Sequence, residues 1–331
     1  MIPRLSDNIS VIARSRELNA DAVEIVVTLP TYKRPEWVLR TLASLKEQRT
    51  ARKFAVIVIE NEAEAREGAK AAEPVITSGE VPGMVIIAHE RGNCSAYNAG
   101  WMTAFVHFPN FTHILVIDDD EMATPGWMES MVRAAEEFEA DVVGAPQIQA
   151  FEDPANEVWS SHPVFQPPYK KSGRVDALYS SGNLLVARRV PETLGTPFLE
   201  PMFNFIGGGD SDFLSRAKQA GFSLAWCAEA PVRETVPARR VEKSWIRARG
   251  LRNGVISTLV EQRKRSSERF GEARTMAKSL ALLAVSPFRA LVQWVLSGSI
   301  STASYPVHVG LGRVMAHFGY ANEQYRHAEK N

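Results

Sequence analysis

Short apolar runs alternate with helix-length amphipathic segments over the first two thirds of the chain. Each run is four to seven residues long, is rich in Val, Ile and Leu, and is typical of a buried strand. The runs are residues 23–29, 54–59, 84–88, 112–117, 142–145 and 183–187. Strands that alternate with helices form a mostly parallel sheet covered by helices, so we predict an α/β fold.

Two of the intervening segments carry clear signals for the start of a helix. Pro35 suits the first turn of a helix, and apolar residues recur at helical spacing from Val38 to Leu45. Thr124-Pro125 offers a cap and a first-turn proline, and an apolar stripe runs from Trp127 to Phe138. Ligands bind at the carboxyl ends of the strands in open α/β sheets, so we expect the chemistry in the loops that follow the strands.

Three consecutive aspartates, Asp118, Asp119 and Asp120, follow directly on the run 112–117. Two unit charges about 4 Å apart repel by roughly 4 kcal/mol at an effective dielectric near 20, so packed carboxylates usually need a cation or a proton. In an extended segment Asp118 and Asp120 would face one site while Asp119 turns away. This pattern indicates a D-x-D metal motif. The alternative is a solvated acidic loop before the next helix.

The loops after the other strands narrow the range of functions. No G-x-G-x-x-G follows the first strand and no Walker A pattern occurs, which disfavours a dinucleotide-binding oxidoreductase and a P-loop enzyme. The second strand ends at Glu60-Asn61, where a carboxylate could accept from a nucleobase or a ribose, or be an ordinary turn acid. In the next loop Ser95 could cap a short helix, and Asn93 and Asn98 offer donors and acceptors.

Overall charge gives no case for a nucleic-acid partner, because 38 Lys and Arg balance 38 Asp and Glu. Residues 238–275 are an exception, with eleven Arg or Lys against four Glu, and they suggest an anionic ligand nearby. The two cysteines, Cys94 and Cys227, and the lack of a signal-peptide pattern predict a reducing cytoplasm.

An apolar segment follows from about residue 273. We expect it to be too short and too interrupted to span a bilayer, because Pro287 and Arg289 lie in its middle. Two readings remain open. Its helices could lie in a membrane interface beside anionic lipid, or they could pack on the catalytic domain or on a second subunit in a homo-oligomer.

The order of the motifs resembles that of the family 2 glycosyltransferases, which have the Rossmann-like GT-A fold and use a nucleotide-diphosphate sugar. Glu60 stands where that family usually has an aspartate that contacts the base, and Gly209 replaces its usual glutamate. The basic segment resembles that of bacterial succinoglycan-type exopolysaccharide transferases. The motifs that carry the resemblance are residues 27–35, 92–100, 116–120, 125–127, 181–189, 207–213 and 245–254.

The resemblance implies roles for particular residues. Asp210 is expected to be the catalytic base, with Asp212 as the alternative. Asp120, with help from Asp118, would hold Mg²⁺ or Mn²⁺, unless Asp118 holds the ribose instead. The residues expected to contact the donor are Pro30, Thr31, Tyr32, Arg34, Glu60, Asn93, Asn98, Asp118, Asp119, Arg249 and Arg252.

The predicted function is that of an inverting, metal-dependent glycosyltransferase in polysaccharide biosynthesis. UDP-glucose is the first expectation for the donor, and the acceptor would be a carbohydrate or a polyprenyl-diphosphate-linked oligosaccharide. We expect residues 1–256 to form the GT-A domain and residues 257–331 a helical extension, in the cytoplasm or on the inner face of its membrane. The rivals are a nucleotidyltransferase and a non-catalytic carbohydrate- or membrane-binding homologue.

Overall fold

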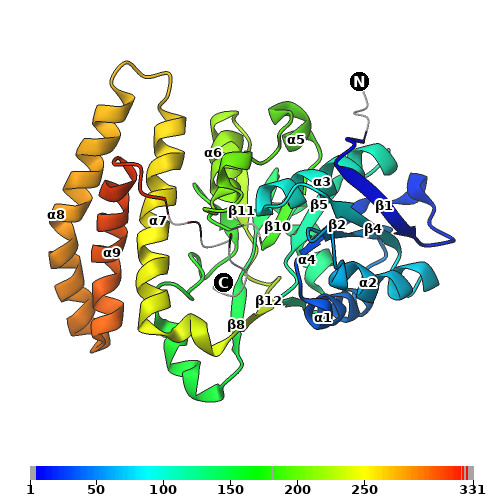
Figure 1. The fold of residues 1–331 in the computed structure, drawn as a ribbon, viewed down its shortest axis with the longest axis horizontal. Helices are drawn as coiled ribbons and strands as arrows, with labels where there is room; N and C mark the ends of the chain where they lie inside the picture. The colour runs from blue at the N-terminus through cyan, green and yellow to red at the C-terminus, as the bar shows by residue number, and fades with distance from the viewer. Residues whose placement is uncertain (1–4, 181, 322, 324–325, 327–331) are drawn as a thin grey trace. The chain divides into compact units, whose positions relative to one another are not determined.

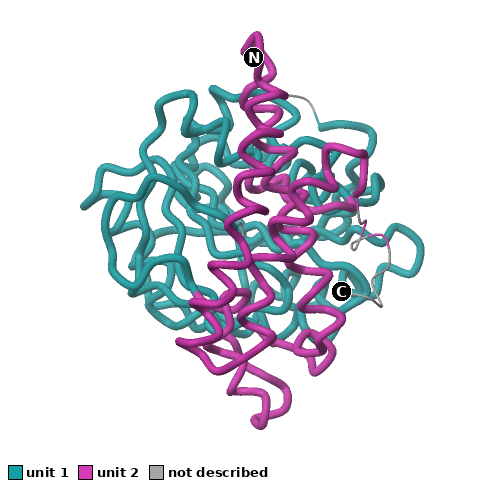
Figure 2. The backbone as a smooth tube through the Cα atoms, turned by 90° about the vertical axis from the view of Figure 1, so that its left-hand side faces the viewer, with its two compact units in different colours: residues 1–148, 167–204, 212–234 teal, residues 149–166, 205–211, 235–331 magenta. Residues whose placement is uncertain are grey.

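The computed structural model describes residues 5–180, 182–321, 323 and 326. Its chain divides into two compact units (Figure 2). Unit 1 comprises residues 1–148, 167–204 and 212–234, and unit 2 comprises residues 149–166, 205–211 and 235–331. The boundary predicted after residue 256 falls inside one continuous helix, α7, Lys243–Lys264. Ser181, the first residue of the motif segment 181–189, lies outside the described residues.

A nine-stranded sheet forms the centre of unit 1 (Figure 1). Its strand order is β1-β4-β3-β2-β5-β10-β7-β11-β9. The strands are β1 Ile9–Arg14, β2 Ile25–Thr31, β3 Phe54–Glu60, β4 Gly83–Ala88, β5 His113–Ile117, β7 Val142–Gly144, β9 Gly173–Arg174, β10 Asn183–Ala187 and β11 Leu224–Trp226. The α/β fold is confirmed by this sheet and its helices.

The sheet is mixed rather than mostly parallel. Strand β2 pairs in parallel with β3 and β5, as β3 does with β4 and β7 with β11. Strand β10 runs antiparallel between β5 and β7, and β1 and β9 join the two edges antiparallel. An apolar run such as Asn183–Ala187 indicates a buried strand but not its direction, because strands buried on both faces have the same composition either way.

Helices cover both faces of this sheet. They are α1 Pro35–Lys46, α2 Glu67–Ser78, α3 Asn93–His107, α4 Trp127–Glu137, α5 Arg189–Leu194 and α6 Gly209–Gln219, with the 3₁₀ turns η1 Ala20–Ala22 and η3 Pro201–Phe203. Alternate β2 residues Ile25, Val27 and Leu29 pack in one core with α1, α2 and α4. Helix α3 lies on the opposite face, where a Cβ on Gly100 would be 2.4 Å from the Ile59 side chain. Helix α3 begins before Ser95, which therefore does not cap it.

A second, three-stranded sheet adjoins the end of β5 in the sequence. Its strands are β6 Glu121–Ala123, β12 Val232–Val236 and β8 Gln147–Phe151, in the order β6-β12-β8. Strand β6 pairs antiparallel with β12, with Glu121 opposite Glu234. The loop that holds the three aspartates is therefore fixed at both ends by strands.

Unit 2 is built around three helices. They are α7 Lys243–Lys264, α8 Gly271–Ser297 and α9 Ile300–Ala316, accompanied by η2 Pro154–Ser161 and η4 Ala238–Val241. Helix α9 packs against both of the others. Its backbone touches that of α7, because a Cβ on Gly254 would lie 2.1 Å from the Val309 carbonyl oxygen and one on Gly312 2.0 Å from that of Leu251. Only glycine fits at these two crossings.

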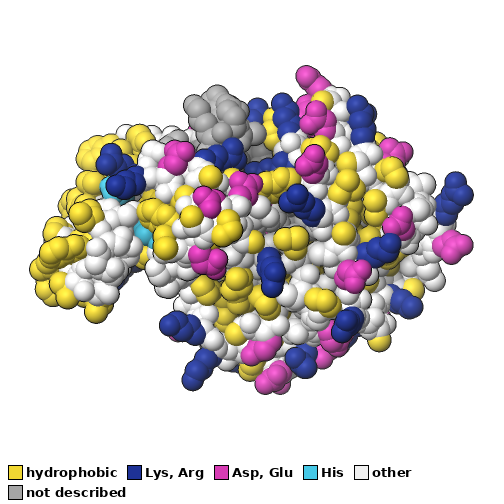
Figure 3. Space-filling view, turned by 90° about the horizontal axis from the view of Figure 1, so that it is seen from below, with side chains coloured by type: hydrophobic (Ala, Val, Ile, Leu, Met, Phe, Trp, Pro, Cys, Tyr) yellow, Lys and Arg dark blue, Asp and Glu magenta, His cyan; other side chains and the backbone are white. Residues whose placement is uncertain are grey.

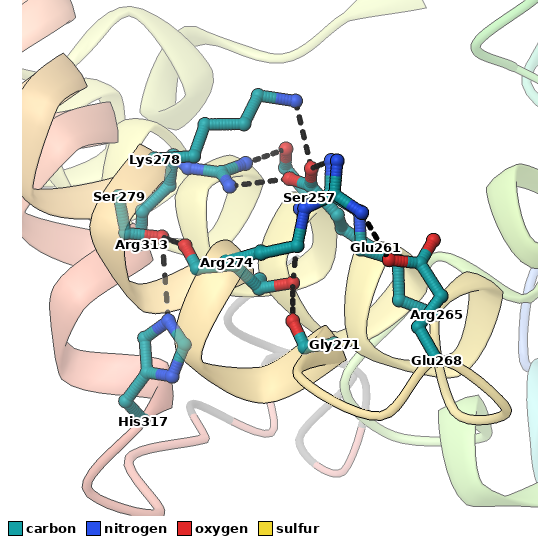
Figure 4. A network of polar contacts seen from close by, with 11 residues as sticks. Ser257, Glu261, Arg265, Glu268, Gly271, Arg274, Lys278, Ser279, Arg313 and His317 are labelled. Atoms are coloured by element: carbon teal, nitrogen blue, oxygen red, sulfur yellow. Dashed lines mark hydrogen bonds and ion pairs between the residues drawn. The ribbon is translucent and has the colours of Figure 1, made fainter.

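Polar contacts join the three helices where α7 ends and α8 begins (Figure 4). The Glu261 carboxylate accepts from Lys278 at 2.8 Å, from Arg313 at 2.6 Å and from Arg265 at 3.0 Å. Burial alone would raise the pKa of Glu261, but the hydrogen bonds from Lys278 and Arg313 lower it overall. This glutamate therefore stays ionised and ties α7 to α8 and α9.

Helix α8 runs through Pro287 without a break, contrary to the interruption expected from the sequence. A proline in a helix leaves the carbonyl four residues earlier without its usual donor. Here that carbonyl belongs to Leu283, and the Ser286 hydroxyl donates to it at 2.7 Å. Among the residues that the structure describes, α8 is long and apolar enough to cross a membrane by length and composition alone.

Candidate active site

The three aspartates lie in a tight turn between β5 and β6. The Glu121 N–H donates to the Asp118 carbonyl oxygen at 3.2 Å, so the chain reverses over Asp118–Glu121, which we call the acidic turn. The alternation of side chains expected for an extended segment therefore does not hold. Asp119 and Asp120 both contact the same guanidinium, that of Arg34.

The loop after β2 and helix α1 hold the acidic turn in place. The Thr31 hydroxyl donates to Asp119 at 2.9 Å, and Arg34 lies 3.0 Å from Asp119 and 3.4 Å from Asp120. The Thr41 hydroxyl of α1 lies 3.0 Å from the Asp119 carbonyl oxygen and 2.7 Å from that of Glu121. Two predicted donor-binding residues, Thr31 and Arg34, are thus brought together with the predicted metal motif.

Four further residues that the sequence did not single out complete the surroundings of Asp118. The Tyr97 hydroxyl of α3 donates to the Asp118 carboxylate, and Glu121 accepts the Asp118 backbone N–H at 2.9 Å. Gln147 donates to Glu121. A Cβ on Gly182 would lie 2.6 Å from Glu121 and 3.1 Å from Asp118, so a side chain there would collide with this cluster.

The acidic turn concentrates more negative charge than its surroundings neutralise. Burial, followed by repulsion from Asp120, raises the pKa of Asp118 to about 7. Burial raises the pKa of Asp119 to about 6, although the Arg34 charge opposes this. Burial and repulsion from Asp118 and Asp120 also raise the pKa of Glu121 well above its usual value. A further cation beside these carboxylates would therefore stabilise their ionised forms.

The oxygen donors of the acidic turn fit a hard divalent cation. Within the described ranges, no three His, Cys, Asp or Glu side chains are arranged to hold a metal between them. Magnesium, however, usually binds to only one or two protein carboxylates and completes its shell with water and substrate phosphate oxygens. Asp118 and Asp120 can supply that share, which leaves the remaining positions to a ligand.

Replacing Asp118 with asparagine should stabilise the metal-free protein in a pH-dependent manner. The Asp118 carboxyl ionises near pH 4 in the unfolded chain, whereas its pKa in the folded protein is about 7. Ionisation of Asp118 in the folded protein therefore lowers the free energy of unfolding by an amount that grows between pH 4 and pH 7 and is constant above pH 7. We expect the variant to gain up to about 4 kcal/mol at pH 8 and little at pH 4. Denaturant unfolding of the two proteins at pH 8 and at pH 4, with a chelator present, measures both gains. An equal gain at the two pH values would contradict the buried, repelled carboxylate.

The comparison with known proteins identifies the domain that contains this turn. Residues 26–189 match the model of "Glycosyl transferase family 2". The chain contains a family 2 glycosyltransferase domain. It is 28% identical over 248 residues to the "Succinoglycan biosynthesis protein ExoM" of Rhizobium meliloti, covering 71% of this chain and 74% of that protein. The chain is a glycosyltransferase, as its motifs predicted.

Solved structures of S. aureus TarS share the GT-A-like fold of this glycosyltransferase. TarS 1-349 in complex with UDP matches with a TM-score of 0.51 and 13% identity, over 90% of this chain and 92% of that chain. TarS 1-349 in complex with UDP-GlcNAc matches with a TM-score of 0.51 and 12% identity. A further crystal structure of S. aureus TarS matches over 86% of this chain and 55% of that chain, so this chain spans about half the length of that relative.

Two residues that were predicted to contact the donor form hydrogen bonds with the backbone of the protein. Glu60 is fully buried, and its carboxylate accepts the N–H groups of Ala69 and Glu62 at 3.0 Å each. Burial raises its pKa, although these hydrogen bonds oppose the shift. The Asn98 amide donates to the Leu199 carbonyl oxygen at 2.7 Å and accepts the Leu199 N–H at 2.8 Å. These contacts favour structural roles for both side chains.

The other predicted donor contacts in unit 1 lie around the β2 loop and the start of α3. Pro30 is half-buried in β2. The Tyr32 ring has the Arg91 guanidinium 5.1 Å and the Lys33 ammonium 5.4 Å from its centre. Asn93 is the first residue of α3 and donates its N–H to the Asn204 carbonyl oxygen at 3.3 Å. The β2 loop therefore combines an aromatic ring with several cations, as expected for binding an anionic, ring-containing ligand.

Both candidate catalytic carboxylates lie in the first turn of α6, in different surroundings. Asp212 is buried and forms an ion pair with Arg216 at 2.9 Å. Arg216 also donates to the Phe198 carbonyl oxygen. Asp210 is only half-buried, and it accepts the N–H of the next residue, Ser211, at 2.7 Å. The Asp212 carboxylate is therefore buried against Arg216 of the same helix, and Asp210 is the more accessible of the two.

The two predicted donor-binding arginines belong to α7 in unit 2. Arg252 is buried there. Arg249 is half-buried, with its guanidinium 5.8 Å from the centre of the Trp245 ring. Trp245 in turn stacks on Phe165, with ring centres 6.3 Å apart. Within unit 2, Arg249 is thus positioned by an aromatic pair.

Proposed function

We propose that this glycosyltransferase transfers a sugar, with inversion, from a UDP-sugar to a carbohydrate or polyprenyl-diphosphate-linked acceptor. The observation that supports this most strongly is the acidic turn. It lies inside a family 2 domain, and Thr31 and Arg34 contact its aspartates Asp119 and Asp120. Glucose is our first expectation for the transferred sugar. The reaction would take place in the cytoplasm, where nucleotide sugars are the substrates of polysaccharide assembly.

On the donor side, Asp120 and Asp118 would bind Mg²⁺ or Mn²⁺. When bound, such an ion neutralises the charge that develops on the diphosphate as it leaves. Arg34 holds Asp119 and Asp120, and Tyr97 holds Asp118, so these carboxylates are positioned by hydrogen bonds from two other segments, the loop before α1 and helix α3. Tyr32 and Arg91 would contact the nucleotide, and Arg249 and Arg252 its diphosphate.

On the acceptor side, Asp210 would act as general base. The acceptor hydroxyl oxygen attacks the anomeric carbon, its proton passes to the Asp210 carboxylate, and UDP leaves with the electrons of the broken C–O bond. A single displacement inverts the configuration at that carbon. Asp210 suits this role better than Asp212, whose carboxylate is buried against Arg216.

The relatives support the class of donor and product. ExoM is named for succinoglycan biosynthesis, and TarS 1-349 has been crystallised with UDP and with UDP-GlcNAc. These names describe those proteins, and they make a UDP-sugar and a polysaccharide product the first possibilities to test for this chain.

A screen of nucleotide sugars tests the proposal directly. Purified full-length chain is incubated with UDP-glucose, UDP-GlcNAc or GDP-mannose, with Mg²⁺ or Mn²⁺ and a bacterial lipid extract as acceptor. We expect UDP release from one UDP-sugar that depends on the extract. Release of pyrophosphate instead would indicate a nucleotidyltransferase. Absence of both binding and release with every donor would support a non-catalytic protein.

A further inference from the structure

Helix α8 buries polar side chains and exposes apolar ones, which is the reverse of a surface helix in a water-soluble protein. Its buried side includes Thr275, Ser279 and Ser286, whereas large apolar side chains project outward. A surface helix in water normally buries its apolar stripe and exposes its polar one. Only 11% of the most apolar stretch of α8 is buried. The exposed apolar residues are Leu280, Val285, Phe288, Leu291, Val292, Trp294, Val295 and Leu296.

We call this set of eight residues the outer face of α8. Figure 3 shows hydrophobic side chains gathered at the left-hand end of the view, where α8 lies in Figure 1. Large exposed apolar patches mark sites of contact with proteins or membranes, because a soluble monomer rarely tolerates them. Ile300, at the start of α9, is also exposed and extends the patch past the turn between the two helices.

The inner packing of the bundle is also of the kind found in lipid. The buried residues of α9 include Ala303, Gly310 and Gly312, and α7 contributes Gly250 and Gly254. Close helix contacts through small residues are typical of membrane helices, where apolar side chains gain nothing by leaving a lipid environment. In α8 many of the large apolar side chains are thus left for the surroundings rather than used for the core.

The charge that belongs to the outer face itself is a cation. Of the four cations between Glu272 and Glu323, Arg274 pairs with Glu268, and Lys278 and Arg313 pair with Glu261, whereas Arg289 lies on the exposed side of α8. Arg289 is exposed and lies among the residues of the outer face. Basic groups beside an apolar helix face complement the anionic headgroups of a membrane surface.

We propose that the outer face of α8 lies on the surface of an anionic membrane, with α8 in the plane of the interface. A position in the interface suits Arg289, whose long side chain can reach the headgroups while its stem stays among apolar neighbours. Trp294 suits the same depth. A symmetric contact with a second copy is less suitable, since it would bury Arg289 in an apolar interface with no Asp or Glu from residues 273–297 of either copy to pair with it.

This surface extends the proposed function, because it would hold the enzyme where a lipid-linked acceptor is found. Its test needs neither donor nor acceptor, so failure of the transfer reaction would not affect it. Full-length protein is mixed with vesicles of phosphatidylcholine alone or with about a third phosphatidylglycerol, and bound protein is measured by flotation. We expect clear binding to the anionic vesicles and much weaker binding to the neutral ones.

A matched pair of variants assigns the binding to α8. Val295 and Val158 have similar exposure, 72% and 76%, but Val158 lies in η2. Val295→Asp should weaken vesicle binding about tenfold or more, because burying one such side chain contributes more than the roughly 1.4 kcal/mol of a tenfold change. Val158→Asp should bind like the unchanged protein. Arg289→Gln should reduce the preference for anionic vesicles.

Three outcomes would overturn the proposal. The first is equal vesicle binding by the Val295→Asp and Val158→Asp variants. The second is no binding of the unchanged protein to either kind of vesicle. The third is that light scattering without vesicles shows the unchanged protein to be a dimer and the Val295→Asp variant to be a monomer. The outer face would then be the contact surface between two copies of the chain. Thermal unfolding of each variant checks that its fold is retained.

Discussion

Replacing Asp120 with alanine should lower the rate of sugar transfer by about a thousandfold, the scale of several kcal/mol of lost charge stabilisation. Asp120 lies in the acidic turn beside Arg34 and is the residue that we propose as a ligand of the divalent cation. Its loss removes ligand oxygen where the diphosphate charge must be neutralised. The fold should survive, because Asp119 keeps its contacts with Thr31 and Arg34.

Two measurements locate the effect of the Asp120→Ala change. UDP release gives the loss of activity, and calorimetric titration of donor with and without Mg²⁺ gives its metal dependence. The unchanged protein should bind donor more tightly with metal, whereas the variant should bind equally weakly in both. Asp176→Ala removes a fully exposed carboxylate and serves as the control, with activity unchanged. Full activity of the unchanged protein in excess chelator would remove the metal from the proposal.

Replacing Asp210 with asparagine should reduce kcat by about 10²- to 10⁴-fold, the usual contribution of a general base. The asparagine keeps the size of the side chain and its hydrogen bond with Ser211, but it cannot take up a proton at neutral pH. Donor KM and thermal stability should therefore change little. Steady-state kinetics of UDP release and a thermal unfolding curve measure these quantities separately.

Asp212→Asn provides the matched comparison, two residues along the same helix. Its carboxylate is buried and paired with Arg216, so the variant should lose about 3 to 5 kcal/mol of stability, as when one partner of a buried ion pair is removed. The molecules that remain folded should still transfer sugar. If Asp212→Asn abolished kcat without destabilising the protein while Asp210→Asn stayed active, the two roles would have to be exchanged.

The alternating layout of unit 1 could be predicted because its strands are apolar enough to be recognised one at a time. Strands β3 and β10 begin where expected, and α1 begins at Pro35. Strand β1, Ile9–Arg14, was missed because it lies at the sheet edge and has no fully buried residue. The antiparallel direction of β10 was missed because direction depends on the path of the chain and not on local composition.

The candidate site was only partly predictable for a related reason. Thr31, Arg34 and the aspartates follow strands and could be found by reading the loops after each strand. Glu121 had a signal, since it makes the acidic run four residues long. Tyr97 and Gly182 lie inside the motif segments 92–100 and 181–189 but carried no signal of their own, and Gln147 had none, because each meets the cluster only after folding brings distant segments together. Glu60 was expected to face the ligand, and its burial depends on the position of α2.

The carboxyl-terminal helices show how a local rule can fail for a physical reason. Pro287 predicts a helix break, but the Ser286 hydroxyl satisfies the Leu283 carbonyl oxygen that the proline leaves open. The resulting continuous helix is what places the apolar residues of α8 on one side. Sequence alone gave their composition, while their outward direction depends on α9 occupying the other side.

The hydrogen bonds around the acidic turn have a consequence for how donor binding is expected to proceed. Thr31, Arg34, Thr41 and Tyr97 hold this turn from three different elements before any ligand arrives. A flexible loop of this length would lose conformational entropy on each encounter, at roughly 1 to 2 kcal/mol per residue ordered. Because the turn is already ordered, that entropy is lost once, during folding, and the affinity for donor is not reduced by it at every catalytic cycle.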